Sequence, residues 1–404
     1  MKRLLKISFD ASLLSFIPIL SWFALSLIID KNLINIFTLV YPIQFVWCML
    51  KCIFSTGANI CKQKDSNNNV VMSGIVIGSS IGALIFGFLV FNVEEYITFM
   101  NMDISTYKIF TVYYLIQLYI QLIFSFVLNK LYYEEKNTLA NRYSITFNIL
   151  NFTLLIGSAL ITKNTIMITS ITLIILAIYT LYITIKSSEK FKLNFNLFKC
   201  IKYDSVDLFN NLAFFFTFLF GLSNALYYGE KYALAITFIS LITDTQWDVF
   251  DAISTVAKID ISKNKFNIKT HVINAYKLFA LLVSSVLIMF LVLFKYYNLD
   301  MTITLLFLSF ELFNFILYPL YRIKTCFLQL EYSASKITCN KVASNSLRLV
   351  SSFLKTPYCT GIGQVSSAIY QTLSINSIFN KNYIIDKSGN IHRRNEDKNE
   401  QTNN

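Results

Sequence analysis

Runs of about 20 apolar residues, long enough to cross a lipid bilayer as helices, recur along almost the whole chain. They lie at about 12–29, 36–58, 70–91, 107–128, 144–162, 165–185, 207–226, 232–257, 275–294, 302–321, 342–356 and 359–380. A backbone inside a bilayer has no water to bond with, so such runs form helices. Because 55% of the residues are hydrophobic and only 14% are charged, we expect an all-α polytopic membrane protein with about 12 transmembrane helices.

The chain has a net charge of +12, and the positions of its basic residues predict how the chain is oriented in the membrane. Lysine and arginine gather in alternate loops between the runs, for example at Lys62, Lys130, Lys258 and Arg322. Such loops stay in the cytoplasm under the positive-inside rule. The sequence therefore predicts a multi-pass plasma-membrane protein with both termini in the cytoplasm. Because the basic residues lie in loops that set the topology in the lipid bilayer, the positive charge does not indicate nucleic-acid binding, and we expect no nucleic-acid partner.

The chain also shows a weak internal repeat, with the first and seventh runs roughly 196 residues apart. Six spans is an even number, so both halves would enter the membrane in the same orientation. Transporters built from such parallel repeats hold their substrate between the halves. We therefore predict a six-helix lobe in residues 1–190, a cytoplasmic linker in 191–206 and a second six-helix lobe in 207–380. The polar tail 381–404 is expected to lack regular structure.

Three aspartates, Asp244, Asp248 and Asp251, interrupt the eighth run. Each carboxylate near the middle of a membrane costs roughly 2.5–3.5 kcal/mol. At about 100° per residue the three share an arc of about 60°, so they face the bundle or a wet cavity. Two interpretations stay open: the acids handle a cation or substrate, or they line a wet cytoplasmic vestibule. Asp244 and Asp248 lie deepest and are the candidates for cation coupling, whereas Asp251 is expected in the vestibule.

Glu311 is a further acid within a span, in the run FLSFELFNFILYP. Its apolar surroundings favour a position facing a central cavity, because a lipid-facing carboxylate would be too costly. We therefore count Glu311 as a third candidate for cation coupling. Asp30 closes the first run and is expected to be a solvated helix end.

Prolines and glycines mark special positions in other spans. A proline inside a helix removes a backbone hydrogen bond and can bend the helix. Pro18, Pro42 and Pro319 could therefore serve as bends during gating or have only a packing role, since proline is common in membrane helices. Small residues at every fourth position allow close helix approach. We expect this packing within the bundle at Gly74, Gly78 and Gly82.

Together these segments resemble the multidrug and toxic compound extrusion (MATE) family of the MOP flippase superfamily. The resemblance rests on Pro18, on FTLVYPIQFVWCMLKCIFSTGANICKQKDSNNN (37–69), on SGIVIGSSIG (73–82) and on LITDTQWDVFDAISTVAKIDISKNKF (241–266). It implies two six-helix lobes, alternating access, and export driven by sodium or protons. Family members often carry an acid in the middle of the first helix, but here the region after Pro18 is uncharged until Asp30. Coupling is therefore expected in the second lobe.

The leading hypothesis is a monomeric, cation-coupled antiporter that exports small amphiphilic or cationic compounds, multidrug efflux included. A flippase for a lipid-linked sugar or precursor is the alternative, although only Lys51, Lys277 and Arg348 would meet its phosphate. A non-transporting receptor or scaffold stays open. An intramembrane prenyltransferase-like enzyme would need a second Asp-rich motif, so we expect no enzyme. Apart from the coupling ion, Na⁺ or H⁺, no cofactor and no metal site are expected.

Overall fold

The computed structural model describes residues 4, 8, 17, 20, 21, 23–30, 33, 35–65, 69–100, 102–162, 164–188, 193–262, 265–297 and 299–394. Within these ranges, the side chains of 65, 230, 244–246, 248–251, 262, 282, 285, 286, 289, 290, 292, 293 and 295–297 are not described. The predicted kink residue Pro18 therefore lies outside the described residues. The side chains of Asp244, Asp248 and Asp251 lie outside them as well.

The described chain is almost entirely helical, which confirms the predicted all-α class. The helices of the first half are α2 (Ile36–Lys51), the π-helical turn η2 (Cys52–Gly57), α3 (Ala58–Asp65), α4 (Val70–Phe91), α5 (Val93–Phe99), α6 (Ile104–Tyr133), α7 (Asn137–Ile161) and α8 (Thr165–Lys186). Those of the second half are α9 (Leu197–Tyr228), α10 (Glu230–Ser262), α11 (Ile268–Tyr297), α12 (Met301–Glu331), α13 (Ala334–Ser352) and α14 (Cys359–Asn382). Two short strands follow, β1 (Tyr383–Ile385) and β2 (Ile391–Arg393).

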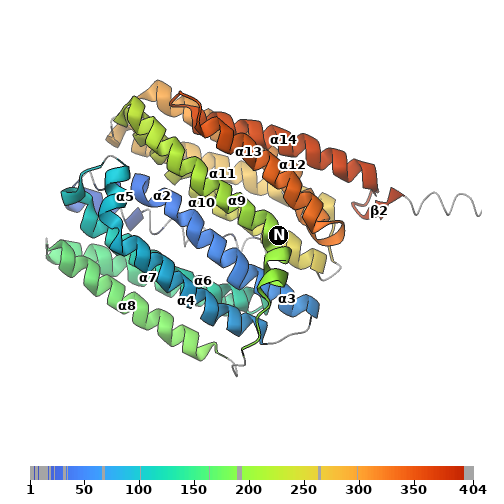
Figure 1. Cartoon of the computed structure of the whole chain (residues 1–404), viewed down its shortest axis with the longest axis horizontal. Helices are drawn as coiled ribbons and strands as arrows, with labels where there is room; N and C mark the ends of the chain where they lie inside the picture. Colours follow the sequence, from blue (N-terminus) through green and yellow to red (C-terminus); the bar gives the residue numbers. More distant parts are fainter. Residues whose placement is uncertain are drawn as a thin grey trace, which may run out of the picture.

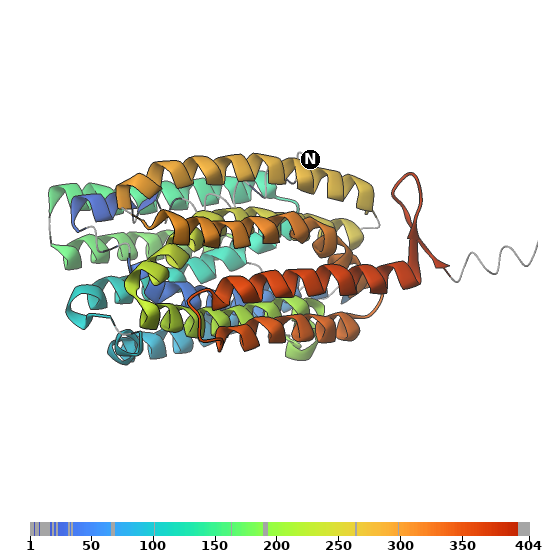
Figure 2. The same cartoon turned by 90° about the horizontal axis from the view of Figure 1, so that it is seen from above.

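The long helices lie side by side along one axis, and the β1–β2 hairpin projects from one end, the hairpin end (Figures 1 and 2). Helices α4, α7 and α8 pack around α6, and α9–α14 pack against one another. Helix α2 joins the two sets, since it packs on α6 and also on α9 and α10. The internal repeat stays a prediction.

Seven helices of the described chain are long and apolar enough to span a membrane: Ile36–Lys64, Val70–Phe91, Ile104–Tyr133, Asn137–Ile161, Thr165–Lys186, Leu197–Tyr228 and Met301–Glu331. They coincide with seven of the predicted runs, so the chain is a multi-pass membrane protein. The polar helices α13 and α14 bury part of their serines and asparagines because they pack against each other and against α9 and α12.

Two predicted boundaries need correction. The linker was expected to extend to residue 206, but α9 begins at Leu197 and the structure has only residues 187–196 between α8 and α9. The tail was expected to lack structure from residue 381, but α14 continues to Asn382 and residues 383–393 form an antiparallel hairpin. Aromatic contacts hold the hairpin, because Tyr383 packs against Phe327 and Phe379 with ring centroids 5.2 and 5.5 Å away.

Four basic residues that the sequence assigned to loops are buried inside the bundle. Lys130, Lys258, Arg322 and Lys341 expose at most 7% of their surface. The Lys130 ammonium donates to the Ser187 carbonyl oxygen over 2.8 Å. Their charge therefore serves contacts within the fold in addition to any effect on orientation.

The glycine stripe of α4 faces neighbouring helices of the same chain. A Cβ atom at Gly74 would lie 2.4 Å from the Phe54 carbonyl oxygen, and one at Gly82 would lie 2.8 Å from a Leu122 methyl group. Gly78 likewise meets Phe54 and Phe126, so η2 and α6 approach α4 closely here. Helices α2 and α12 continue through Pro42 and Pro319, and both prolines are buried.

Candidate substrate and ion site

A buried carboxylate in the middle of the C-terminal helices is the centre of the candidate site. Glu311 lies on α12 and exposes only 7% of its surface. The Trp247 indole N–H of α10 donates a hydrogen bond to Glu311 Oε2 over 3.2 Å. Gln364 of α14 lines the same cavity as Glu311. Three helices thus converge on a single acid.

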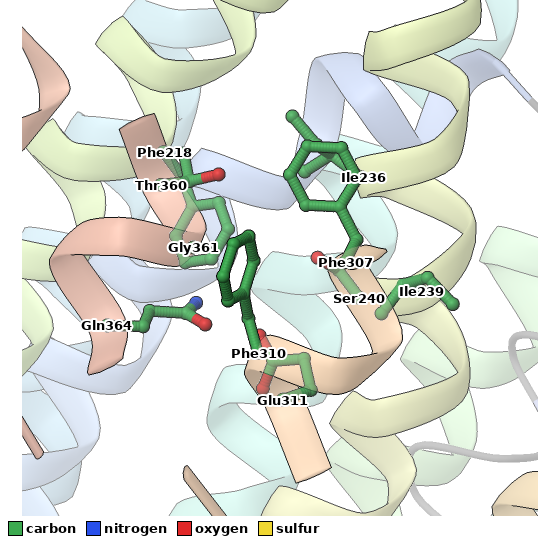
Figure 3. Close-up of a pocket in the computed structure, with 10 residues that line it drawn as sticks. All are labelled: Phe218, Ile236, Ile239, Ser240, Phe307, Phe310, Glu311, Thr360, Gly361 and Gln364. Atoms are coloured by element: carbon green, nitrogen blue, oxygen red, sulfur yellow. The ribbon is translucent and has the colours of Figure 1, made fainter. Parts of the chain in front are cut away.

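Glu311 lines a small cavity whose other walls are mostly apolar (Figure 3). Helix α12 supplies Phe307 and Phe310, and α10 supplies Ser240 and two isoleucines. The remaining wall comes from α9 and α14, which contribute Phe218, Thr360, Gly361 and Gln364. A carboxylate beside aromatic rings can attract a cation both by charge and through the ring faces.

A buried guanidinium lies within electrostatic range of Glu311 without pairing to it. Arg348 on α13 is 2% exposed. Its Nη1 donates to Asn210 Oδ1 on α9 over 3.3 Å, and its planar group lies 4.2 Å over the Phe214 ring. The region around the cavity therefore holds a buried acid and a buried base that do not form an ion pair.

Nearer the hairpin end, four charged residues form a compact ion-pair cluster, here called the charge cluster. Lys258 Nζ of α10 lies 2.6 Å from carboxylate oxygens of both Asp204 and Asp207 on α9. Arg322 Nη2 of α12 lies 2.7 Å from Asp207, and its Nε donates to Ser254 Oγ over 2.6 Å. Helix α9 has non-helical backbone angles at Asp204, which bend it at the cluster.

Contacts between the first-half and second-half helices occur at the level of the Glu311 cavity and nearer the hairpin end. Thr38 of α2 and Thr237 of α10 share a hydrogen bond of 2.7 Å, although they are 199 residues apart in the chain. Towards the hairpin end, Ile60 of α3, Tyr133 of α6 and Ile259 of α10 form an apolar cluster. The two sets of helices are therefore in contact at the level of the cavity and nearer the hairpin end, and the cavity is too small for an organic substrate in this conformation.

The N-terminal helices bury several amide side chains. Gln117 of α6 donates to Asn151 Oδ1 of α7 over 3.0 Å, and Asn148 lies one turn away on α7. All three are at most 3% exposed. Neutral amides can coordinate a cation but supply no negative charge. Among the described residues, the buried acids and their basic partners thus lie in α9–α14.

The structure brings one of the predicted coupling residues, Glu311, to the cavity. Asp30 is exposed beyond the end of a short helical stretch, residues 23–28, and lies apart from the site. Where α10 packs against α12 and α2, the backbone of Asp244 and Asp248 is helical, but their side chains are not described. No group of three or more metal-binding side chains occurs among the residues that the structure describes.

Sequence reasoning missed several residues of the charge cluster and the Trp247 partner of Glu311. Asp204 was assigned to the linker, Asp207 to the start of the seventh run and Lys258 to a loop, so their pairing could not be inferred. Like charges three positions apart do not favour a helix, so the spacing of Asp204 and Asp207 gave no signal that α9 begins before them. Trp247 lies three positions after Asp244 and directly before Asp248, and no pattern in the sequence links it with Glu311.

Comparison with known proteins identifies the architecture. No protein-family profile and no curated protein matches the sequence. Among solved structures, a MOP superfamily transporter from Pyrococcus furiosus matches with a TM-score of 0.69 at 13% identity, covering 93% of this chain and 95% of that one. An outward-facing MATE family transporter matches with a TM-score of 0.67 at 14% identity and the same coverage. A MATE in the straight conformation has a TM-score of 0.64 at 13% identity, again over 93% of this chain and 95% of that one. The chain therefore has the fold seen in MATE transporters of the MOP superfamily.

Proposed function

We propose that the protein is a secondary active transporter that exports small amphiphilic compounds, cationic ones included, in exchange for sodium ions or protons. The observation that carries this proposal is Glu311, an acid buried at a cavity of aromatic and apolar residues in a MATE-type fold. A carboxylate in such a place binds and releases a cation as the cavity opens to either side of the membrane. We infer that the protein works as a monomer in the plasma membrane, with both termini in the cytoplasm.

The mechanism follows from competition for one acid. When Glu311 holds Na⁺ or H⁺, its negative charge is neutralised, so a cationic or amphiphilic substrate is held less tightly. When the site faces the ion-poor side, the ion leaves and the substrate binds. Coupling requires only that binding of the ion weakens binding of the substrate in the same cavity, and the reverse. Trp247 holds the carboxylate in position by its hydrogen bond.

The test is transport in proteoliposomes with an imposed sodium or proton gradient and an organic cation as substrate. We expect Glu311→Gln to reduce gradient-driven transport at least tenfold, because the amide cannot exchange charge. Asp244→Asn combined with Asp248→Asn is expected to weaken transport as well. Asp30→Asn is the matched control, since Asp30 is exposed and away from the cavity, and it should transport normally. Unchanged gradient-driven transport in Glu311→Gln would overturn the role of Glu311.

A flippase for an anionic lipid-linked precursor is the second candidate function. It is favoured by one observation, the buried Arg348 beside the cavity. The Pyrococcus furiosus transporter is described as having a binding pocket of reverse polarity that suggests a different function. Translocation of a fluorescent lipid diphosphate across vesicles, absent in Arg348→Gln, would support this candidate over drug export.

A further inference from the structure

Arg348 is a buried guanidinium that the proposed coupling mechanism does not use. It is 2% exposed, and its Nε has no hydrogen-bond acceptor among the described residues. One bond, from Nη1 to Asn210 Oδ1, satisfies part of its donor capacity. Since a guanidinium carries five N–H donors in a planar fork, most of that capacity is available to another group.

The positive charge of Arg348 also lacks a neutralising contact. In the part of the chain that the structure describes, no carboxylate lies within ion-pair distance of it, and Glu311 interacts only at longer range. Helix α13 packs against α9, α12 and α14, all of which have described side chains here. A buried charge without a counter-charge is costly, so a ligand that supplies the opposite charge would relieve that cost.

The surroundings of Arg348 fit an oxyanion attached to a flat apolar body. Its planar group lies over the Phe214 ring, and Phe214 stacks on Phe45 of α2 at 5.2 Å between centroids. Phe45 in turn stacks on Phe218 at 5.5 Å. Phe218 belongs to the wall of the Glu311 cavity. The aromatic row thus connects the buried base to the cavity with the buried acid.

We propose that Arg348 and Asn210 form an oxyanion subsite, so that the transported amphiphile carries a carboxylate, sulfonate or phosphate group beside an aromatic or apolar body. The guanidinium fork binds two oxygens of such a group, and the Asn210 amide turns its N–H₂ towards the anion when the bond to Arg348 is given up. This inference rests on the proposed transport function and narrows its substrate class to amphiphiles that carry such an oxyanion as well as the cationic group that competes with the ion at Glu311.

The binding test uses biphenyl-4-carboxylate and its neutral analogue biphenyl-4-carboxamide on the purified full chain in detergent. Thermal unfolding is followed while each compound is titrated. We expect saturable stabilisation by the carboxylate and at least tenfold weaker stabilisation by the amide, a difference of about 1.4 kcal/mol. Equal stabilisation by the two compounds would overturn the subsite.

Variants test whether the preference for the carboxylate arises at Arg348. Arg348→Gln should remove the preference for the carboxylate, and Arg348→Lys should keep a weaker preference, because an ammonium is a point charge without the fork. Asn210→Ala should weaken carboxylate binding by a smaller factor without loss of folding. Phe214→Leu should weaken both compounds alike. If Arg348→Gln binds the carboxylate as the native protein does, the anion lies elsewhere and the proposal is wrong.

The same compounds separate this proposal from the coupling role of Glu311. Glu311→Gln should bind biphenyl-4-carboxylate with its charge preference intact while losing gradient-driven transport. Absence of transport in every variant, with binding still dependent on Arg348, would refute transport and leave the subsite standing. Transport that depends on Glu311 but ignores Arg348 and prefers organic cations would refute the subsite alone.

Discussion

The charge cluster and the Glu311–Arg348 region hold balanced charges in the same helices but arrange them differently. In the charge cluster, both aspartates lie within 2.7 Å of Lys258 or Arg322 nitrogens, so every charge has a partner. In the other region, Glu311 and Arg348 are also buried, but they bind Trp247 and Asn210 instead of each other. The difference indicates that paired charges hold the helices together, whereas separated charges stay available to an ion or a substrate.

Removing the central cation of the charge cluster should have the largest effect on stability. Lys258→Met leaves Asp204 and Asp207 buried with one cation, Arg322, for two carboxylates. Loss of one partner of a buried pair costs about 3–5 kcal/mol. We expect a clear fall in the unfolding temperature of the purified protein in detergent.

A double variant tests whether charge balance is the cause. Lys258→Met with Asp204→Asn leaves one acid and one base, Asp207 and Arg322, which still pair. This variant should recover most of the lost stability. If the single variant unfolds at the native temperature, the paired charges do not hold α9, α10 and α12 together, and the contrast between the two regions fails.

A matched pair of arginine variants compares the two regions directly. Arg322→Met should destabilise by about 3–5 kcal/mol, because Asp207 loses one of its two cationic partners and Ser254 loses the Arg322 donor. Arg348→Met should change stability by about 1 kcal/mol or less, since no carboxylate loses a direct partner. Unfolding of both proteins by heat under one condition checks this. Equal losses would show that Arg348 is a structural residue like Arg322.

Sequence reasoning found the fold because hydrophobic run length is a strong local signal. The spans at α4, α6, α7 and α8 need no tertiary information, since each is apolar over about 20 residues. The same reasoning found Glu311, because an acid among apolar residues is conspicuous. It failed for Lys258 and Arg322, whose charges look like those of ordinary cytoplasmic loops until α9 is seen to bend towards them.

The hairpin could not be predicted for a related reason. Residues 383–393 mix polar and apolar side chains, and their structure depends on contacts made elsewhere. The Ile268 N–H donates to the Gly389 carbonyl oxygen over 3.2 Å, and Asn267 donates to the Ser388 carbonyl oxygen over 3.0 Å. Gly389 has a φ angle of +95°, which favours glycine, so the turn and its docking on α11 depend on this residue.

The hairpin offers the smallest expected effect, because its key carboxylate is exposed. The Ser388 hydroxyl and the Asn390 backbone N–H donate to Asp386 and hold the pKa of its carboxyl group below the usual range. A lowered pKa means that this carboxylate stabilises the turn above about pH 4, and that the contribution is lost as the pH falls through the folded-state pKa. Asp386→Asn should therefore raise the hydrogen exchange of the β1–β2 amides at pH 7 and leave the unfolding temperature of the bundle almost unchanged. Lys387→Gln, whose side chain has no part in the turn bonds to Asp386, is the control. If Asp386→Asn leaves hairpin exchange at the native rate, an exposed carboxylate contributes nothing here, and only the buried charges distinguish one region of this molecule from another.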